Sequence, residues 1–480
     1  MPRQIRKLIF YTSIIIGLLS AFSIALYAYG SQSTLPSNFA VAGWRVGGMP
    51  YDKFQQQYEQ RLKLLTSFPV QLQTSYSDIP NRQLALGELG VQYQKEALEQ
   101  SLGQLFGSSL IERIKARWTL RHANIPLEVT VNQKQLGTRV KEAWKDLYSQ
   151  HPVAAKRIVT TQDTLTYEPE RKVLRIDTAH LVEHLKEIAP SISYIYNAAP
   201  IRLTLPLYEQ SPAVTIETLK RQGIDRKISE FTTSFPTSGE GRIHNIRSTA
   251  ASIQDLLMAP GEIFDYSKII EQTEAQFGYK EAPVILNGKL VPGIGGGICQ
   301  VSTTLYNAVL RSGLDIVERR NHSLPVSYVT LGQDATFASG FINFKFRNST
   351  DAYLLIRTIT TDQAVTVKLF GQMSPSITYD IDSNIVETIQ PPIKYLHNAS
   401  LSPGATRPIS IGKAGYKVET YRIKRENGTM VSKELISKDQ YSPVPTLIAS
   451  NRGDIKTEEG SPPAPVQPIL EDGVKGPAFR

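Results

Sequence analysis

The chain has 480 residues, which is enough for about three domains with a hydrophobic core each. Its net charge of +9 is spread along the sequence and forms no Lys/Arg-rich block, so we expect no nucleic-acid partner, whereas an anionic envelope polymer or membrane surface fits the charge. Cys299 is the single cysteine, which excludes an internal disulfide.

The N-terminal segment is the first predicted element. Residues 8–29 carry no charge and follow Arg3, Arg6 and Lys7. A helix of this length spans the hydrocarbon core of a membrane, and the basic flank predicts a cytoplasmic N-terminus. A cleaved signal peptide is the alternative, because small residues end this segment. Since the run is longer than a usual signal h-region, we expect residues 1–30 to be a cytoplasmic stub and a single transmembrane helix, with the rest of the chain outside the cytoplasm.

Residues 44–210 alternate between predicted strands and amphipathic helices. Phe54, Tyr58 and Leu62 share one helix face, and Leu181 and Leu185 repeat this spacing later. Strand–turn–strand–helix units in tandem predict a repeated α+β domain.

His180 and His184 belong to an HxxEH pattern, the inverted zinc motif, on the last of these helices. The sequence offers no convincing third ligand, so we expect a solvated or satisfied histidine pair and no metal. We also expect no cofactor.

A glycine-rich stretch lies near the middle of the chain. Four of the five residues from Gly293 to Gly297 are glycines, which predicts a tight loop with uncovered amides. Helical spacing follows at Val301, Leu305 and Val309. We therefore expect an α+β domain with a cysteine at a helix N-terminus.

This placement predicts a reactive thiol. Unpaired amides and the helix dipole favour negative charge, so they should lower the pKa of Cys299. The amides of the loop could form an oxyanion hole, for which Gly295, Gly296, Gly297 and Gln300 are the candidates.

His322 and Asp334 follow Cys299 along the chain. The order cysteine, histidine, acid occurs in several thiol acyl-transfer enzymes, with the histidine as base and the acid orienting the imidazole. A buried structural cysteine in a well-packed helix is the alternative, since free cysteine is among the most buried residue types.

Six motifs follow one another between residues 231 and 371. They are Asn245-Ile-Arg-Ser-Thr-Ala-Ala, Ala259-Pro-Gly-Glu-Ile-Phe-Asp-Tyr, Gly278-Tyr-Lys-Glu-Ala-Pro-Val-Ile, Gly295-Gly-Gly-Ile-Cys-Gln-Val-Ser-Thr-Thr-Leu-Tyr-Asn-Ala, Arg319-Arg-Asn-His-Ser and Gly332-Gln-Asp-Ala-Thr. Together they resemble the VanW family, which is named for an accessory protein of vancomycin-resistance clusters and implies a role in the bacterial cell envelope. Asn343 stands where we expect an acidic residue of the family, which argues against an essential acid at that position.

The flanking regions resemble two further families. Residues 44–210 are similar, more weakly, to the peptidoglycan-binding domain often found before a VanW region. Residues 376–450 contain alternating segments and the hairpin turn Glu426-Asn-Gly, which predict a small all-β domain. Their glycines and Tyr441-Ser-Pro-Val-Pro resemble the five-glycine, or G5, domain, which implies binding of N-acetylglucosamine or adhesive partners. Residues 451–480, rich in Pro, Gly and charge, predict a disordered tail.

Two function classes remain open. The first is a membrane-anchored extracytoplasmic protein that binds peptidoglycan or its precursors in cell-wall maintenance or glycopeptide response. The second is a thiol-dependent acyl transferase or hydrolase acting on peptidoglycan stem peptides, with a transglutaminase-like or papain-like arrangement of Cys299, His322 and Asp334.

Overall fold

The computed structural model describes residues 3–193, 199–286, 289–451 and 469–475. The chain divides into two compact units. The first comprises Met1–Ala154 and Glu170–Ala213, and the second comprises Ala155–Pro169 and Val214–Arg480.

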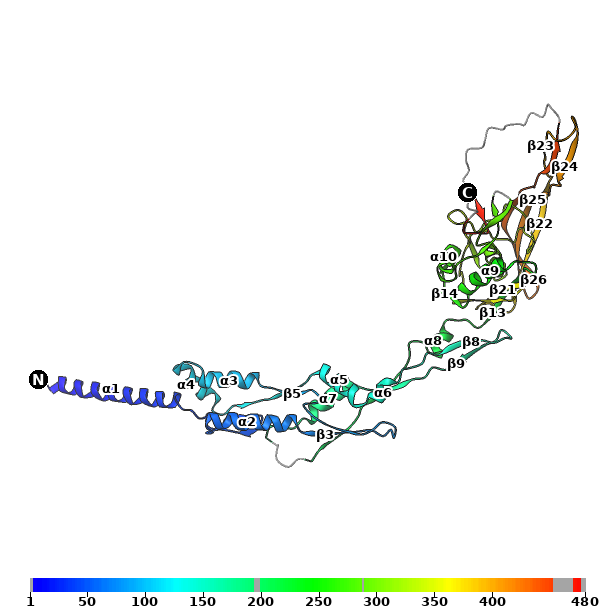
Figure 1. Ribbon diagram of the computed structural model, residues 1–480. Helices are drawn as coiled ribbons and strands as arrows, with labels where there is room; N and C mark the ends of the chain where they lie inside the picture. Colours follow the sequence, from blue (N-terminus) through cyan, green and yellow to red (C-terminus); the bar gives the residue numbers. More distant parts are fainter. Residues whose placement is uncertain (1–2, 194–198, 287–288, 452–468, 476–480) are drawn as a thin grey trace. The chain divides into compact units, whose positions relative to one another are not determined.

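The first unit mixes helices with short strands (Figure 1). Its helices are α1 (Arg3–Gly30), α2 (Tyr51–Thr66), α3 (Glu96–Phe106), α4 (Leu110–Leu120), α5 (Gln133–Ala143), α6 (Lys145–Ser149) and α7 (Thr178–Ile188). Its strands are β1 (Ala40–Val41), β2 (Trp44–Arg45), β3 (Pro69–Gln73), β4 (Arg82–Ala85), β5 (Val91–Gln94), β6 (Asn124–Ile125), β7 (Glu128–Val131), β10 (Val173–Ile176), β11 (Ile201–Thr204) and β12 (Leu207–Gln210).

Helix α1 is long and apolar. It has 28 residues, and none of its most apolar 18-residue window, of mean hydropathy 2.1, is buried. Length and composition of this kind suit a membrane anchor and a signal sequence alike.

Two separate hydrophobic cores lie in the first unit. Phe54 of α2 and Leu98 of α3 belong to one, and Leu136 of α5 and Leu181 of α7 belong to the other. Each core joins helices to short strands, so the predicted mixed α+β fold is confirmed.

The second unit contains the glycine-rich stretch and the C-terminal strands. Its helices are α8 (Ile216–Arg221), α9 (Glu240–Ser252), α10 (Tyr266–Phe277) and α11 (Ile298–Leu310). Its strands are β8 (Lys156–Val159), β9 (Leu165–Glu168), β13 (Arg226–Ser234), β14 (Leu256–Met258), β15 (Ile263–Asp265), β16 (Glu281–Leu286), β17 (Lys289–Ile294), β18 (Asp315–Glu318), β19 (Lys345–Arg347), β20 (Leu354–Thr360), β21 (Ala364–Gly371), β22 (Ile377–Ile389), β23 (Ile393–His397), β24 (Thr406–Ser410), β25 (Gly415–Glu426), β26 (Thr429–Tyr441), β27 (Thr446–Ser450) and β28 (Leu470–Glu471).

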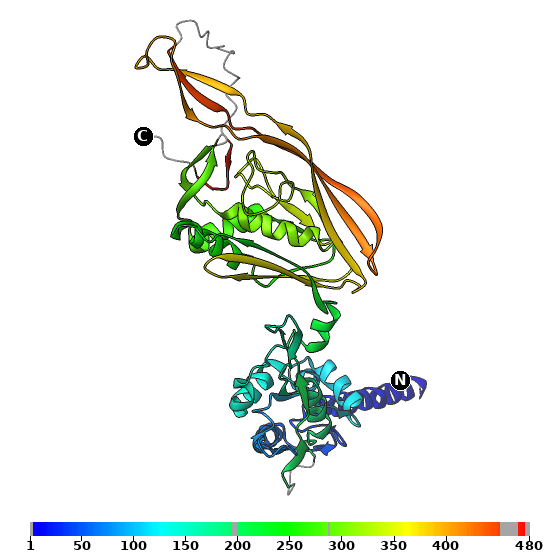
Figure 2. The same cartoon turned by 90° about the vertical axis from the view of Figure 1, so that its right-hand side faces the viewer.

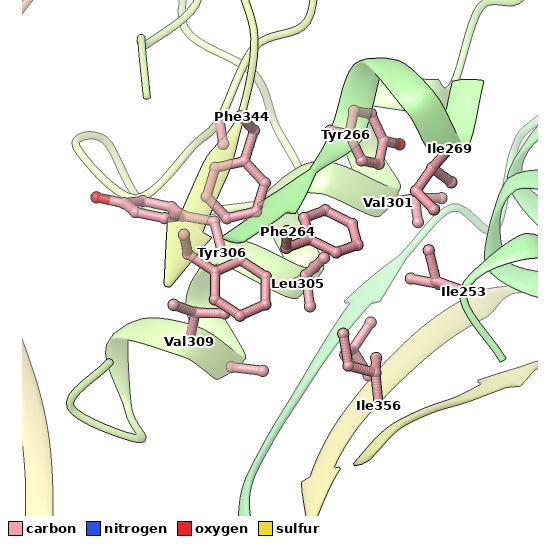
Figure 3. Packing of buried hydrophobic residues seen from close by; sticks show 14 of the residues in the cluster. Ile253, Phe264, Tyr266, Ile269, Val301, Leu305, Tyr306, Val309, Phe344 and Ile356 are labelled. Atoms are coloured by element: carbon pink, nitrogen blue, oxygen red, sulfur yellow. The ribbon is translucent and has the colours of Figure 1, made fainter. Parts of the chain in front are cut away.

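Helix α11 is the centre of the second unit (Figure 2). All of its residues are buried, and it packs on the antiparallel sheet β13-β21-β20-β14 and on α9. Apolar side chains such as Val301 and Leu305 fill the core around it (Figure 3). Most of its polar side chains are satisfied, as where Ser302 donates to the Ala335 carbonyl at 2.6 Å and Asn307 to the Gln333 carbonyl at 2.7 Å. The Tyr306 hydroxyl is buried without a partner among the described residues. A helix that is buried all round needs such partners, because an unpaired polar group would be costly there.

The C-terminal strands form the sheets β22-β25-β26 and β23-β27-β24. Strands β25 and β26 are joined at Asn427 and Gly428, whose φ angles are 49° and 81°. Two positive φ angles are typical of a two-residue hairpin turn, so the hairpin predicted from Glu426-Asn-Gly is confirmed.

Candidate functional site

The glycine loop before α11 is closely packed against its neighbours. Gly297 is the N-cap residue of α11 and has a φ of 109°, a left-handed conformation that favours glycine. A Cβ atom at Gly297 would lie 3.0 Å from side-chain atoms of Arg242 and Ile246, and one at Gly296 would lie 2.3 Å from the Pro283 carbonyl oxygen. The loop is therefore rich in glycine because its backbone contacts α9 and β16 directly.

The amides at the start of α11 hold a carboxylate. Asp472 Oδ1 accepts hydrogen bonds from the N–H groups of Gly297 at 3.1 Å and Cys299 at 2.8 Å. Its Oδ2 lies 3.0 Å from Arg242 Nη1, and Arg242 also donates to Gln300 Oε1 at 3.0 Å. The expectation of uncovered amides is thus wrong for Gly297 and Cys299, because a helix N-terminus attracts an available carboxylate.

The amides of two other oxyanion candidates, Gly295 and Gln300, also donate to backbone carbonyls. The N–H of Gly295 donates to the Lys280 carbonyl at 3.1 Å, and the N–H of Gln300 donates to the Gly297 carbonyl at 3.1 Å. The carbonyl of Gly296 accepts from Asn245 Nδ2 at 3.0 Å.

Cys299 is the second residue of α11, and the protein encloses its thiol. The residue is fully buried, and its Sγ accepts from the N–H of Phe337 at 3.0 Å. Burial raises the pKa of the Cys299 thiol well above its ordinary value, and the Asp472 carboxylate raises it further. The expectation of a lowered pKa is therefore wrong for this structure, since both effects disfavour a thiolate.

His322 and Asp334 form a buried pair. Asp334 Oδ2 lies 2.7 Å from His322 Nδ1 and accepts from the His322 backbone N–H at 2.6 Å. Burial would lower the pKa of His322, but the hydrogen bond and charge of Asp334 outweigh it and raise that pKa. Burial would raise the pKa of Asp334, but His322 and the Arg319 guanidinium lower it to about 2.

His322 Nε2 and the Tyr328 hydroxyl are buried without a hydrogen-bond partner among the residues that the structure describes, as is the Tyr306 hydroxyl of α11. The Asp472 carboxylate acts on the first two groups, because it contributes to raising the pKa of His322 and, after burial, that of Tyr328. Since Nε2 is unpartnered, the Cys299 sulfur and the His322 ring are not hydrogen-bonded to each other. Tyr328 was missed in the sequence because it belongs to no motif.

The acid of this pair is held by the C-terminal strands. The Tyr441 hydroxyl, at the end of β26, donates to Asp334 Oδ1. Arg319 lies 3.3 Å from Asp334 Oδ1 and 2.6 Å from Asp439 Oδ1, with both of its partners buried. The sequence motifs placed Arg319 beside the histidine, but nothing local connects them to Tyr441 or Asp439.

Residues 469–475 are ordered, which corrects the expectation of a disordered tail for this part of 451–480. Strand β28 pairs antiparallel with β16, and the Glu471 carboxylate accepts from the Ser323 N–H at 3.0 Å. The chain then delivers Asp472 to the start of α11. The order of this segment could not be predicted from the sequence, because it depends on strand pairing and salt bridges with distant residues.

His180 and His184 belong to the first unit, and the Nδ1 atom of His184 is buried without a hydrogen-bond partner among the described residues. His180 pairs through Nδ1 with Asp177, the N-cap residue of α7, at 2.6 Å. Asn343 Nδ2 donates to Asp265 Oδ1 at 2.7 Å, beside the start of α10. Within the described ranges, no group of three His, Cys, Asp or Glu side chains is arranged to hold a metal ion.

Three family models match the chain in the predicted order. Residues 83–191 match the family described as "Putative peptidoglycan binding domain", residues 241–370 match "VanW like protein", and residues 382–450 match "G5 domain".

Two curated relatives match the central part of the chain. The uncharacterized protein YoaR of Bacillus subtilis (strain 168) is 38% identical over 165 residues, which cover 34% of this chain and 54% of YoaR. The vancomycin B-type resistance protein VanW of Enterococcus faecalis (strain ATCC 700802 / V583) is 30% identical over 156 residues, which cover 32% of this chain and 57% of that protein. The chain thus spans about half the length of these relatives.

Two solved structures match the C-terminal strands. The G5 domain of IgA1 protease is 28% identical and covers 16% of this chain and 93% of its own, with a TM-score of 0.14. The HP0197 G5 domain is 22% identical, and the match covers 15% of this chain and 96% of that structure's chain, with a TM-score of 0.12.

The mixed α+β units, the peptidoglycan-binding match and the G5 match fit a multi-domain cell-envelope protein. Residues 241–370 and the two relatives support a VanW-family protein, as the six motifs predicted.

Proposed function

We propose that the protein acts outside the cytoplasm, where it binds peptidoglycan or its precursors in cell-wall maintenance or glycopeptide response, and that α1 anchors it to the cytoplasmic membrane. The match of residues 83–191 to a peptidoglycan-binding family carries this proposal. The G5 match and the net charge of +9 agree with an anionic wall polymer as partner.

Co-sedimentation tests the binding. Residues 31–480 are mixed with purified insoluble peptidoglycan at low salt, and fragments 31–213 and 214–480 are compared with them. We expect residues 31–213 to retain most of the binding and soluble peptidoglycan fragments to compete. Full binding by residues 214–480 and none by residues 31–213 would contradict the assignment to the N-terminal unit.

The buried His322–Asp334 pair favours a second function, a thiol-dependent acyl transferase or hydrolase acting on stem peptides. Asp334 fixes Nδ1 of the imidazole, which leaves the unpartnered Nε2 to act as a base. In this scheme the Cys299 sulfur attacks a peptide carbonyl carbon, the thiol proton passes to Nε2, and the C–N bond breaks as that proton moves to the leaving amine. An acceptor amine or water then attacks the thioester, the C–S bond breaks, and the thiol regains a proton.

Mass spectrometry of the intact protein after incubation with soluble stem peptides tests this scheme. We expect a covalent acyl adduct on the chain and its loss in Cys299→Ala. His322→Gln should reduce the rate of adduct formation at least tenfold while leaving the thiol in place. Adducts of equal yield in Cys299→Ala would exclude the thiol as nucleophile.

A further inference from the structure

Three donors from two elements converge on one carboxylate position. The N–H groups of Gly297 and Cys299 point from the start of α11, and the Arg242 guanidinium comes from α9. Gln300 holds Arg242 in place, and the Asp472 carboxylate between these donors is buried. Without a carboxylate, the donors would be left unpaired in a buried position, which is costly.

The main chain on both sides of Asp472 pairs with neighbouring strands, and it turns at Asp472 itself, whose φ is 58°. Leu470 and Glu471 pair with Leu286 and Ile285 of β16. Further on, the Ile294 N–H donates to the Lys475 carbonyl at 2.8 Å. An edge strand that binds an added peptide through its main chain accepts many side-chain sequences.

Glycines make room for this strand. A Cβ atom at Gly293 would lie 2.9 Å from the Lys475 carbonyl oxygen, and one at Gly295 would lie 3.1 Å from the Val474 nitrogen. On the other side, a Cβ at Gly473 would lie 2.6 Å from Val284 Cγ1. These glycines therefore allow the backbone of residues 473–475 to approach β16 and the glycine loop closely.

Polar groups that residues 470–475 do not satisfy lie close by, since Ser323, which follows His322, donates its N–H to Glu471 Oε2 at 3.0 Å. His322 Nε2 and the Tyr328 hydroxyl are buried without a hydrogen-bond partner among the described residues. Glu471 and Asp472 are both within electrostatic reach of His322. A ligand that offered further donors or acceptors could bond to these atoms, which residues 470–475 leave unused.

We propose that β16 and the start of α11 form a binding site for a short peptide with a carboxylate, and that residues 470–475 occupy this site as an intramolecular stand-in. The carboxylate lies on the amides of Gly297 and Cys299 and on Arg242. The peptidoglycan stem peptide is the ligand class, a choice that rests on the proposed function. Because the stand-in is tethered, it competes at an effective concentration on the order of millimolar, so a free ligand binds weakly until the segment is displaced.

Fluorescence anisotropy on residues 31–480 tests the site. The variants are Asp472→Asn, a chain ending at residue 468, and Asp380→Asn as a control, since Asp380 is an exposed carboxylate on β22. The probes are a labelled peptide of residues 469–475 with an amidated end, its Asp-to-Asn form, and a labelled stem peptide with a free or an amidated C-terminus. The first two probes test recognition of a side-chain carboxylate. The two stem-peptide probes test recognition of a C-terminal carboxylate.

We expect at least tenfold tighter binding of the acidic probes to Asp472→Asn and to the shortened chain than to the parent or to Asp380→Asn. Neutralising the acidic group of a probe should weaken its binding tenfold or more. Arg242→Met in the shortened chain should weaken the binding of the acidic probes by as much. Equal binding of acidic and neutral probes, or no binding to the shortened chain, would overturn the proposal.

The same samples separate this proposal from the catalytic one. Shortened chain with Cys299→Ser should bind the acidic probes as tightly as shortened chain with Cys299. If shortened chain with Cys299 binds the stem peptide but forms no acyl adduct, the peptide site stands and the enzyme proposal fails. If the parent forms adducts and Asp472→Asn changes neither binding nor adduct rate, the peptide-site proposal fails alone.

Discussion

The Cys299 sulfur lies between the backbone of Phe337 and the first turn of α11, and the nearest carboxylate, Asp472, binds the amides that would otherwise stabilise a thiolate. Its reactivity therefore depends on burial and on Asp472 more than on the helix dipole.

We expect the native thiol to react slowly with iodoacetamide at pH 7.5 and to become reactive on unfolding. Asp472→Asn should increase the native rate several-fold, because it removes the negative charge beside the sulfur. Rates measured from pH 6 to 10 give the apparent pKa, with Asp380→Asn as the unchanged control. An apparent pKa below about 8.5 in the parent would contradict the buried, carboxylate-flanked thiol.

The His322–Asp334 pair links stability to pH. The pKa of Asp334 falls from 3.8 to about 2 in the folded protein. This shift corresponds to about 2 kcal/mol of folding stability, which is present above pH 3.8 and is lost as pH falls towards 2. The raised pKa of His322 contributes stability that is present below its unfolded value of about 6.5 and is lost as pH rises through its folded pKa. The pair therefore stabilises the fold most between about pH 4 and 6.5.

Asp334→Asn should lower the free energy of unfolding by about 3 kcal/mol in this pH range, because His322 and Arg319 lose a buried charged partner. Urea denaturation of residues 31–480 at pH 5.5 and pH 9 measures the cost, which should be smaller at pH 9. Asp382→Asn changes a partly exposed carboxylate on β22 and should lower the free energy of unfolding by less than about 0.5 kcal/mol. An equal cost for both variants at pH 5.5 would contradict the role of the pair.

At the level of elements, the join between the glycine loop and α11 depends on two separate requirements. Gly297 needs a positive φ, and it also approaches Arg242 and Ile246 closely. Gly340 has a φ of 76° with nothing within 4 Å of its Cβ position, so a substitution there tests the positive φ alone.

Gly297→Ala should therefore destabilise the protein by about 3 kcal/mol, and Gly340→Ala by about 1 kcal/mol, because only the first adds steric overlap to backbone strain. Urea denaturation of both variants measures the difference. If the two alanines had equal effects, the packing of the loop against α9 would be unimportant.

At the scale of the whole molecule, α1 decides the topology. With Arg3, Arg6 and Lys7 before the apolar run, we expect a reporter enzyme fused after residue 480 to be active only outside the cytoplasm. The full chain should remain in the membrane fraction after a carbonate wash. Mature protein that begins near Ser31 by N-terminal sequencing would instead identify α1 as a signal peptide.

The sequence alone determined features that depend on neighbouring residues. The start of α11 after its glycines, the hairpin at Asn427 and Gly428, and the order of the three family regions could all be predicted, because turn chemistry and helical periodicity act over a few residues. The pairing of His322 with Asp334 was suggested by order, since only twelve residues separate them.

Only the tertiary structure decided the chemistry around Cys299. Asp472 is 173 residues away in sequence, and Tyr441 is 107 residues from Asp334. No local pattern indicates such contacts, because they arise when separate strands pack on one core. Their consequences for pKa follow from burial and charge at close range, which depend on the folded positions of these groups.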